Sequence, residues 1–201
     1  MTTWARRASA GACAALILAA AVSTASARSF SLSSEQISAA WSPLNFIVGS
    51  FEPITIRCVL SLEGSFHART FAKVREALVG YITRPAIHSP CTNGEFHVLA
   101  ETAPWHLRYE GFTGALPRIT SIRTRLIEFS IWFNSALGLR CLYRSTVTNP
   151  AALTLFFESG TPTSAALEVT LPETQGGMCL GTIRIEGTGG RVTTAATLSL
   201  I

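Results

Sequence analysis

The chain has 201 residues, and 16 lysines and arginines against 12 acidic residues give it a formal net charge of +4. This balance is not the strongly basic signature of a nucleic-acid-binding protein, so no nucleic-acid partner is expected. All the acidic residues are glutamates. EF-hand calcium loops, triads with an aspartate and paired-aspartate active sites are therefore excluded.

The first 27 residues have the pattern of a secretory signal peptide. Arg6 and Arg7 precede a short apolar run at residues 14–22, and Ala25-Ser26-Ala27 forms a small-x-small cleavage site. The apolar run is too short to cross a bilayer as a helix, and no later run reaches that length. We expect residues 1–27 to be removed and the mature chain, which has no integral membrane span, to be secreted or held in the cell envelope. An uncleaved N-terminal anchor is the alternative.

Residues 28–52 predict an N-terminal segment with a short helix. Ser33 and Gln36 have the spacing of a capping box, and apolar residues follow at helical spacing as far as Trp41. Pro43 would end this helix after two turns. We expect the helix to cover an open edge or one end of a sheet.

Residues 53–201 predict a single antiparallel β domain. Apolar and polar residues alternate in about ten short segments, which are separated by turn signals at glycine, proline and asparagine. Such spacing is typical of an all-β fold, either a β-sandwich or a flattened β-barrel. One stretch, residues 70–79, fits a helix or two strands with an irregularity near Glu76, and we favour the strands.

The clearest alternation follows Pro104, where one side of the predicted strand is apolar and the other polar. The predicted core positions are Trp105, Leu107 and Tyr109, and the predicted exposed positions are His106, Arg108 and Glu110. After a turn, the run from residue 118 to residue 133 has no glycine or proline, but its apolar residues change parity. We predict one long strand here, with a β-bulge at Leu126-Ile127.

Four cysteines follow the signal peptide: Cys58, Cys91, Cys141 and Cys179. An even number of cysteines in an exported chain predicts two disulfides. None of the four forms a C-x-x-C pair, which argues against a zinc or redox site. Of the three possible connectivities we favour local pairing, Cys58 with Cys91 and Cys141 with Cys179.

No pattern of catalytic or metal-binding residues stands out. The four histidines lack ligand spacing, and no G-x-S-x-G motif occurs. We therefore predict no catalytic residue, no metal and no cofactor. The fold can still assemble a triad or a carboxylate pair from distant residues, and Glu110 and Glu128 are the candidates for such a pair.

Arginine is the most suggestive residue type in a chain whose only lysine is Lys73. Five arginines fall on the polar side of three successive predicted strands: Arg108, Arg123, Arg125, Arg140 and Arg144. Because successive strands are usually neighbours, we expect these side chains to share one outer face. Guanidinium groups bind carboxylates and phosphates bidentately, so this face predicts binding of an acidic envelope glycan or a lipid headgroup. The alternative is a solvated face whose arginines pair with Glu110 and Glu128.

Three segments resemble a family of small secreted proteins of unknown function from high-GC bacteria: CVLSLEGSFHARTFAKV, PWHLRYEGFTGALPRIT and RCLYRS. The resemblance covers most of the mature chain and implies export and a shared fold, but no activity, cofactor or substrate. We expect an exported, non-enzymatic β domain of the extracellular space or cell envelope. Two other classes stay open: a secreted hydrolase with an unrecognised Glu, His or Ser site, and a membrane-associated β-barrel.

Overall fold

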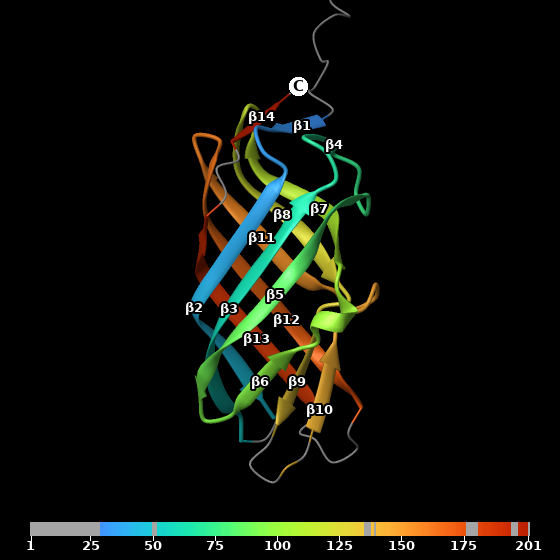
Figure 1. The fold of residues 1–201 in the computed structure, drawn as a ribbon. Coiled ribbons are helices and arrows are strands. Elements are labelled where there is room, and N and C mark those ends of the chain that lie inside the picture. The colour runs from blue at the N-terminus through green and yellow to red at the C-terminus, as the bar shows by residue number, and fades with distance from the viewer. Residues whose placement is uncertain are drawn as a thin grey trace, which may run out of the picture.

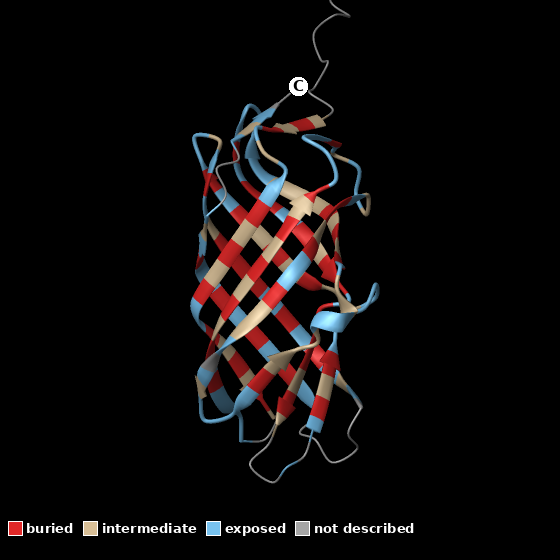
Figure 2. Cartoon of the chain, viewed as in Figure 1, coloured by how far each residue is buried: buried red, intermediate tan, exposed pale blue. Residues whose placement is uncertain are grey.

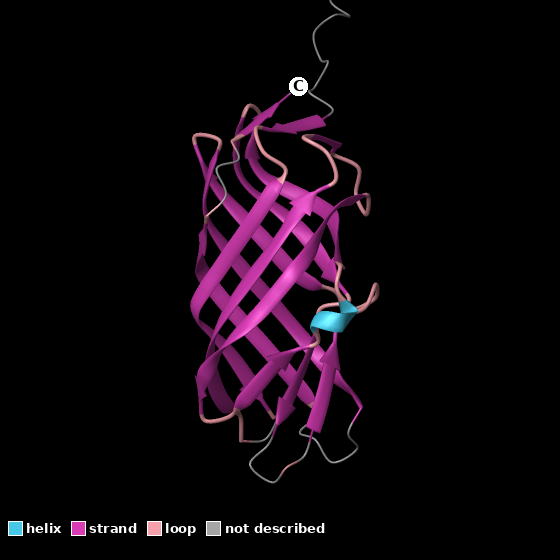
Figure 3. Cartoon of the chain, in the orientation of Figure 1, coloured by secondary structure: helices cyan, strands magenta, loops and turns pink. Residues whose placement is uncertain are grey.

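The computed structural model describes residues 29–49, 52–134, 138, 140–175, 181–193 and 197–200. Apart from a single 3₁₀ turn at Ala100–Thr102, these residues form strands and their connections (Figure 3). No helix within these ranges is long and apolar enough to cross a bilayer. The strands are β1 (Ser29–Leu32), β2 (Gln36–Val48), β3 (Ile54–Phe66), β4 (Thr70–Ala72), β5 (Leu78–Thr92), β6 (Glu95–Val98), β7 (Trp105–Ala115), β8 (Arg118–Ile127), β9 (Ser130–Asn134), β10 (Arg140–Arg144), β11 (Ala151–Glu158), β12 (Thr161–Gln175), β13 (Thr182–Val192) and β14 (Leu198–Leu200).

Eleven strands form one antiparallel sheet that closes on itself (Figure 1). Their order is β11-β8-β7-β5-β3-β2-β13-β12-β10-β9-β6. β11 also pairs with β12, where Leu153 lies opposite Leu167, so the strands from β11 to β12 make a closed ring. The predicted antiparallel all-β fold is confirmed.

Two groups of three strands lie between the long strands β5 and β12, and we call them walls. The upper wall consists of β7, β8 and β11, and the lower wall of β6, β9 and β10 (Figure 1). β5 pairs with β7 along Leu78–Ile82, and β12 pairs with β11 along Thr161–Glu168. Farther along, Glu173 and Gln175 of β12 pair with β10 of the lower wall.

Alternation along the strands fills the interior with apolar side chains, and buried and exposed positions alternate along each strand (Figure 2). Trp41 and Trp105 are the largest of them and are 1% and 0% exposed. The predicted core positions Trp105, Leu107 and Tyr109 are confirmed as buried. The polar positions between them are half-buried rather than fully exposed; His106 contacts Glu128, and Glu110 contacts Arg75 and Arg123.

The predicted N-terminal helix is wrong, because its residues belong to strand β2. Ile37, Ala39 and Trp41 are buried at alternate positions, and β2 pairs with both β3 and β13. The register with β3 shifts between Trp41 and Leu44, after which the even-numbered positions are buried. The helix was predicted from the spacing of Ser33 and Gln36 and from apolar residues that also fit a helix, and pairing with β3 and β13 overrides these local signals.

The single long strand predicted for residues 118–133 is also wrong. β8 ends at Ile127 and β9 begins at Ser130, and between them Glu128 has a φ of 71°. β8 pairs with β7 and β11 in the upper wall, whereas β9 pairs with β6 and β10 in the lower wall. The parity change near Leu126-Ile127 therefore marks the passage of the chain from one wall to the other, not a bulge.

The ambiguous stretch, residues 70–79, contains two strands with an irregularity near Glu76, as predicted. β4 ends at Ala72, Glu76 has a φ of 66°, and β5 begins at Leu78. β4 belongs to a small sheet, β14-β1-β4, that covers the upper end of the ring (Figure 1). Phe30 of β1 is fully buried there, with its ring centroid 5.3 Å from that of Phe71.

One predicted disulfide is present, and it joins Cys58 of β3 to Cys91 of β5. Cys141 is buried on β10, but Cys179 lies outside the described residues, so the second predicted disulfide stays a prediction. The signal peptide predicted for residues 1–27 also lies outside them.

A seam separates β5 from the lower wall. The ladder between β5 and β7 ends at Ile82, and in the described residues β6 pairs with β9 alone. The lower half of β5 pairs with β3 on its other side and contains Pro85 and Pro90. Proline has no N–H, and within sheets it is confined to edges and bulges. The seam is therefore an open edge of β5.

Candidate functional site

The five predicted arginines lie on two walls. The upper wall carries Arg108 on β7 and Arg123 and Arg125 on β8, and the lower wall carries Arg140 and Arg144 on β10. β8 pairs with β7 and β11, whereas β10 pairs with β9 and β12. Strands β8 and β10 are therefore not neighbours, because the chain changes walls at Glu128.

The lower-wall arginines are held by neighbours on β9. The guanidinium carbon of Arg140 lies 4.1 Å from the ring centroid of Trp132, and the ring of His97 stacks on the same indole at 4.1 Å. Arg144 donates from Nε to Oγ of Ser130 at 2.9 Å. His97, Trp132 and Arg140 come from β6, β9 and β10, so this stack ties the three strands of the lower wall together.

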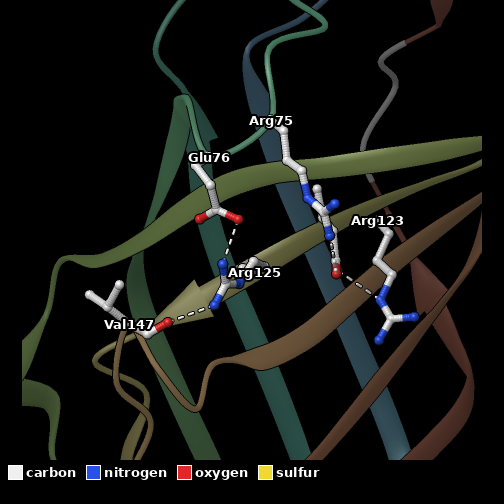
Figure 4. A network of polar contacts seen from close by, with 6 residues as sticks. Arg75, Glu76, Arg123, Arg125 and Val147 are labelled. Carbon is white, nitrogen blue, oxygen red and sulfur yellow. Dashed lines mark hydrogen bonds and ion pairs between the residues drawn. The ribbon is translucent and has the colours of Figure 1, made fainter.

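In the upper wall, Arg108 and Arg125 lie directly opposite each other across the β7–β8 ladder. Like charges in such a pair destabilise a sheet unless a counter-charge is near. Glu76 supplies it to Arg125, whose Nη1 forms an ion pair with the carboxylate while Nη2 donates to the carbonyl of Val147 at 2.6 Å (Figure 4). The charge of Arg125 is therefore matched.

A second carboxylate on this face is shared by two arginines. Oε2 of Glu110 lies 2.9 Å from Nε of Arg123, and Oε1 lies 3.8 Å from Nη2 of Arg75 (Figure 4). Glu128, the other predicted partner, instead contacts Nδ1 of His106 at 2.9 Å. Each carboxylate of the candidate catalytic pair is thus engaged with a cationic or imidazole partner.

Arg108 differs from its neighbours because its side chain has no hydrogen bond or ion pair with any residue that the structure describes. Its Nε atom is nonetheless buried. Leu78 of β5 lies opposite it on one side and Arg125 on the other. A guanidinium nitrogen withdrawn from water without a partner is costly. The rest of this half-buried side chain carries a positive charge without a counter-charge in the described residues, and a bound anion would supply one.

These side chains form a set that we call the arginine cluster: Arg75, Glu76, Arg108, Glu110, Arg123 and Arg125. Four arginines against two glutamates leave an excess of two positive charges. Arg75 and Glu76 were not predicted as members of this site, because the sequence around them fits either a helix or two strands. The backbone around Glu76 fixes them in place, since the N–H of Glu76 donates to the carbonyl of Tyr109 at 2.8 Å and the N–H of Tyr109 donates to Ala77 at 2.9 Å.

A groove of about 540 Å³ lies at the upper end of the molecule, between the β7–β8 turn, the β11–β12 turn and β14. Its polar side chains are Arg118, Thr120, Glu158, Ser159 and Ser199. Within the described ranges, no group of three or more histidines, cysteines and acidic residues has an arrangement that could hold a metal. The arginine cluster is therefore the stronger candidate site.

Comparisons with known protein families, with curated proteins and with solved structures found no match to the chain.

Proposed function

We propose that the protein is an exported, non-enzymatic β domain of the extracellular space or cell envelope that binds anionic groups at the arginine cluster. The signal-peptide pattern supports export. The observation that carries the binding proposal is Arg108, a half-buried guanidinium that has no partner among the described residues and lies opposite Arg125. The ligand chemistry is a carboxylate, sulfate or phosphate of an envelope glycan or a lipid headgroup.

Within the proposed site, some members of the cluster would bind the anion and others would hold the binding residues in place. Glu76 and Glu110 hold Arg125 and Arg123 in place, and the exposed fraction of the Arg125 side chain is only 21%. The guanidinium of Arg108 lies beside this fixed frame and supplies uncompensated charge. Because such charges are screened within about 8 Å at physiological ionic strength, binding should weaken as salt rises.

The test is retention of the mature protein on heparin, used as a polyanion probe, across a salt series. Arg108→Gln should elute at lower salt than the parent protein. The matched control is Arg84→Gln, which removes the same charge from an arginine on β5 that already pairs with Glu63 at 2.9 Å. Equal shifts for the two variants would show that retention depends only on the net charge of the protein and not on Arg108. Absence of retention of the parent protein would refute the proposal.

A further inference from the structure

The arginine cluster is bordered by apolar side chains that are exposed. Large apolar residues with notable exposure in the described ranges are Ile54 (49%), Val74 (58%), Leu78 (38%), Leu116 (40%), Val147 (53%) and Phe156 (39%). Three of them, Val74, Leu78 and Val147, adjoin members of the cluster. Such residues would not help to bind a soluble polyanion such as a glycan, because their side chains form no hydrogen bonds with it.

Each of the three is placed by a specific contact. Val74 precedes Arg75, and its carbonyl accepts from the N–H of Ala77 at 3.1 Å in the turn that carries Glu76. Leu78 lies directly opposite Arg108 in the β5–β7 ladder. The two turns bearing Val74 and Val147 are joined through Arg125, whose guanidinium contacts both Glu76 and the carbonyl of Val147 (Figure 4).

The apolar border extends along the outer face of the upper wall. Phe156 of β11 lies opposite Ser121 of β8, two residues from Arg123 on the same side of the strand. Farther round the ring, Ala152 faces Arg125 on one side and Glu168 on the other. The carboxylate of Glu168 thus marks a limit of the cationic, apolar-bordered surface.

We propose that this surface docks on an anionic lipid bilayer, an inference that rests on the proposed anion-binding function and names its partner. Arginines attract the phosphate-bearing headgroups, and exposed valine and leucine side chains gain by entering the boundary between headgroups and acyl chains. Both requirements are met at one place. Arg108 supplies unmatched charge beside Leu78, and the two turns that carry the valines both contact Arg125.

The experiment measures co-sedimentation of the mature protein with vesicles of equimolar phosphatidylglycerol and phosphatidylcholine, and with vesicles of phosphatidylcholine alone. Heparin retention is measured in parallel. The parent protein should bind the anionic vesicles and not the neutral ones. Val74→Ser/Val147→Ser keeps every charge and should lower the vesicle affinity about tenfold or more, from the loss of two apolar contacts, while heparin retention is unchanged.

Two further variants complete the design. Arg108→Gln should lower vesicle affinity about fivefold and also reduce heparin retention. Ile54→Ser removes an apolar side chain of similar exposure at the start of β3, away from the cluster, and should leave both measurements unchanged. Circular dichroism checks that each variant is folded. Folding is expected because the substituted apolar residues, Val74, Val147 and Ile54, are exposed.

The outcomes separate the two proposals. Heparin binding without binding to anionic vesicles would overturn docking and leave the anion-binding function in place. Vesicle binding that is equal in the double valine variant and the parent protein would also overturn the docking surface, since the apolar border would then contribute nothing. Failure to bind either probe would overturn both proposals.

Discussion

The two walls of the molecule use arginine in different ways. Both walls lie between β5 and β12, and both carry arginines on their outer faces. In the lower wall, Arg140 lies over Trp132 and Arg144 is hydrogen-bonded to Ser130. In the upper wall, the strand opposite Arg108 supplies another arginine. Whether an arginine stabilises the sheet or remains available to a ligand therefore depends on the residue that the neighbouring strand places opposite it.

Replacing a tryptophan in each wall should give the largest difference. Trp105 of the upper wall points inward, is fully buried and donates from Nε1 to Oγ1 of Thr102 at 2.8 Å. Trp132 of the lower wall is half-buried and points outward. Trp105→Ala should lower the free energy of unfolding by about 3–5 kcal/mol and Trp132→Ala by about 1–2 kcal/mol. Denaturant unfolding measures both, and equal losses would show that the inward and outward assignments are mistaken.

Removing the disulfide should loosen the lower wall more than the upper wall. Cys58 and Cys91 are 33 residues apart, and loop-closure entropy predicts a loss of about 3–4 kcal/mol for Cys58→Ala/Cys91→Ala. Cys91 lies at the end of β5 that leads into β6, whereas β7 pairs with the other end of β5. Hydrogen exchange should therefore lose more protection in β6 and β9 than in β7 and β8. The reverse order would contradict this account.

A buried tyrosine in the lower wall should make stability depend on alkaline pH. Burial, with the negative charge of Glu173, raises the pKa of Tyr143 to about 12 from the ordinary value of 10.0. Between these two pH values the unfolded chain loses the phenolic proton and the native chain keeps it. The free energy of unfolding should thus fall by about 2–3 kcal/mol as pH rises from about 10 to about 12.

The matched variant for this prediction is Tyr143→Phe. The hydroxyl of Tyr143 is buried and has no hydrogen-bond partner in the described residues. Its removal should therefore lower the free energy of unfolding by about 1 kcal/mol or less at neutral pH. The variant should lose less stability than the parent protein between the two pH values, as measured by chemical denaturation. Parallel curves for the two proteins would rule out Tyr143 as the source.

The smallest effects concern one arginine of each wall. Arg108→Gln relieves repulsion from Arg125 and should leave the free energy of unfolding within about 0.5 kcal/mol of the parent value, or raise it. Arg140→Gln loses its contact with the Trp132 ring and should cost about 0.5–1 kcal/mol. Thermal unfolding compares them. A clear destabilisation by Arg108→Gln would mean that this guanidinium has a structural partner.

Local patterns were enough to predict the parts of the fold that depend on local sequence. The inward phase of Trp105, Leu107 and Tyr109 follows from strict alternation, and the irregularity at Glu76 follows from a break in it. The Cys58–Cys91 pairing agrees with a preference for local bridges. Each of these features involves residues in one strand or in strands that pair directly.

The features that were predicted wrongly, or not predicted, depend on which strands become neighbours. A change of parity near Leu126 has the same appearance whether the strand bulges or ends and crosses to another wall, so the separation of β8 from β10 could not be seen. The contact between Glu76 and Arg125 joins residues 49 positions apart through a turn with positive φ. The period of a sequence carries no information on such a contact, so Arg75 and Glu76, two of the six members of the arginine cluster, were missed.

The two prolines in the lower half of β5 have a consequence for how copies of the protein meet. An open strand edge is a template on which a second chain can add a strand, and this is a common route to edge-to-edge aggregation. Pro85 and Pro90 lie in the stretch of β5 that borders the seam, and neither has an N–H to donate. An incoming strand would find its ladder interrupted there. The protein should consequently resist sheet-to-sheet association at high concentration although its sheet has an open edge.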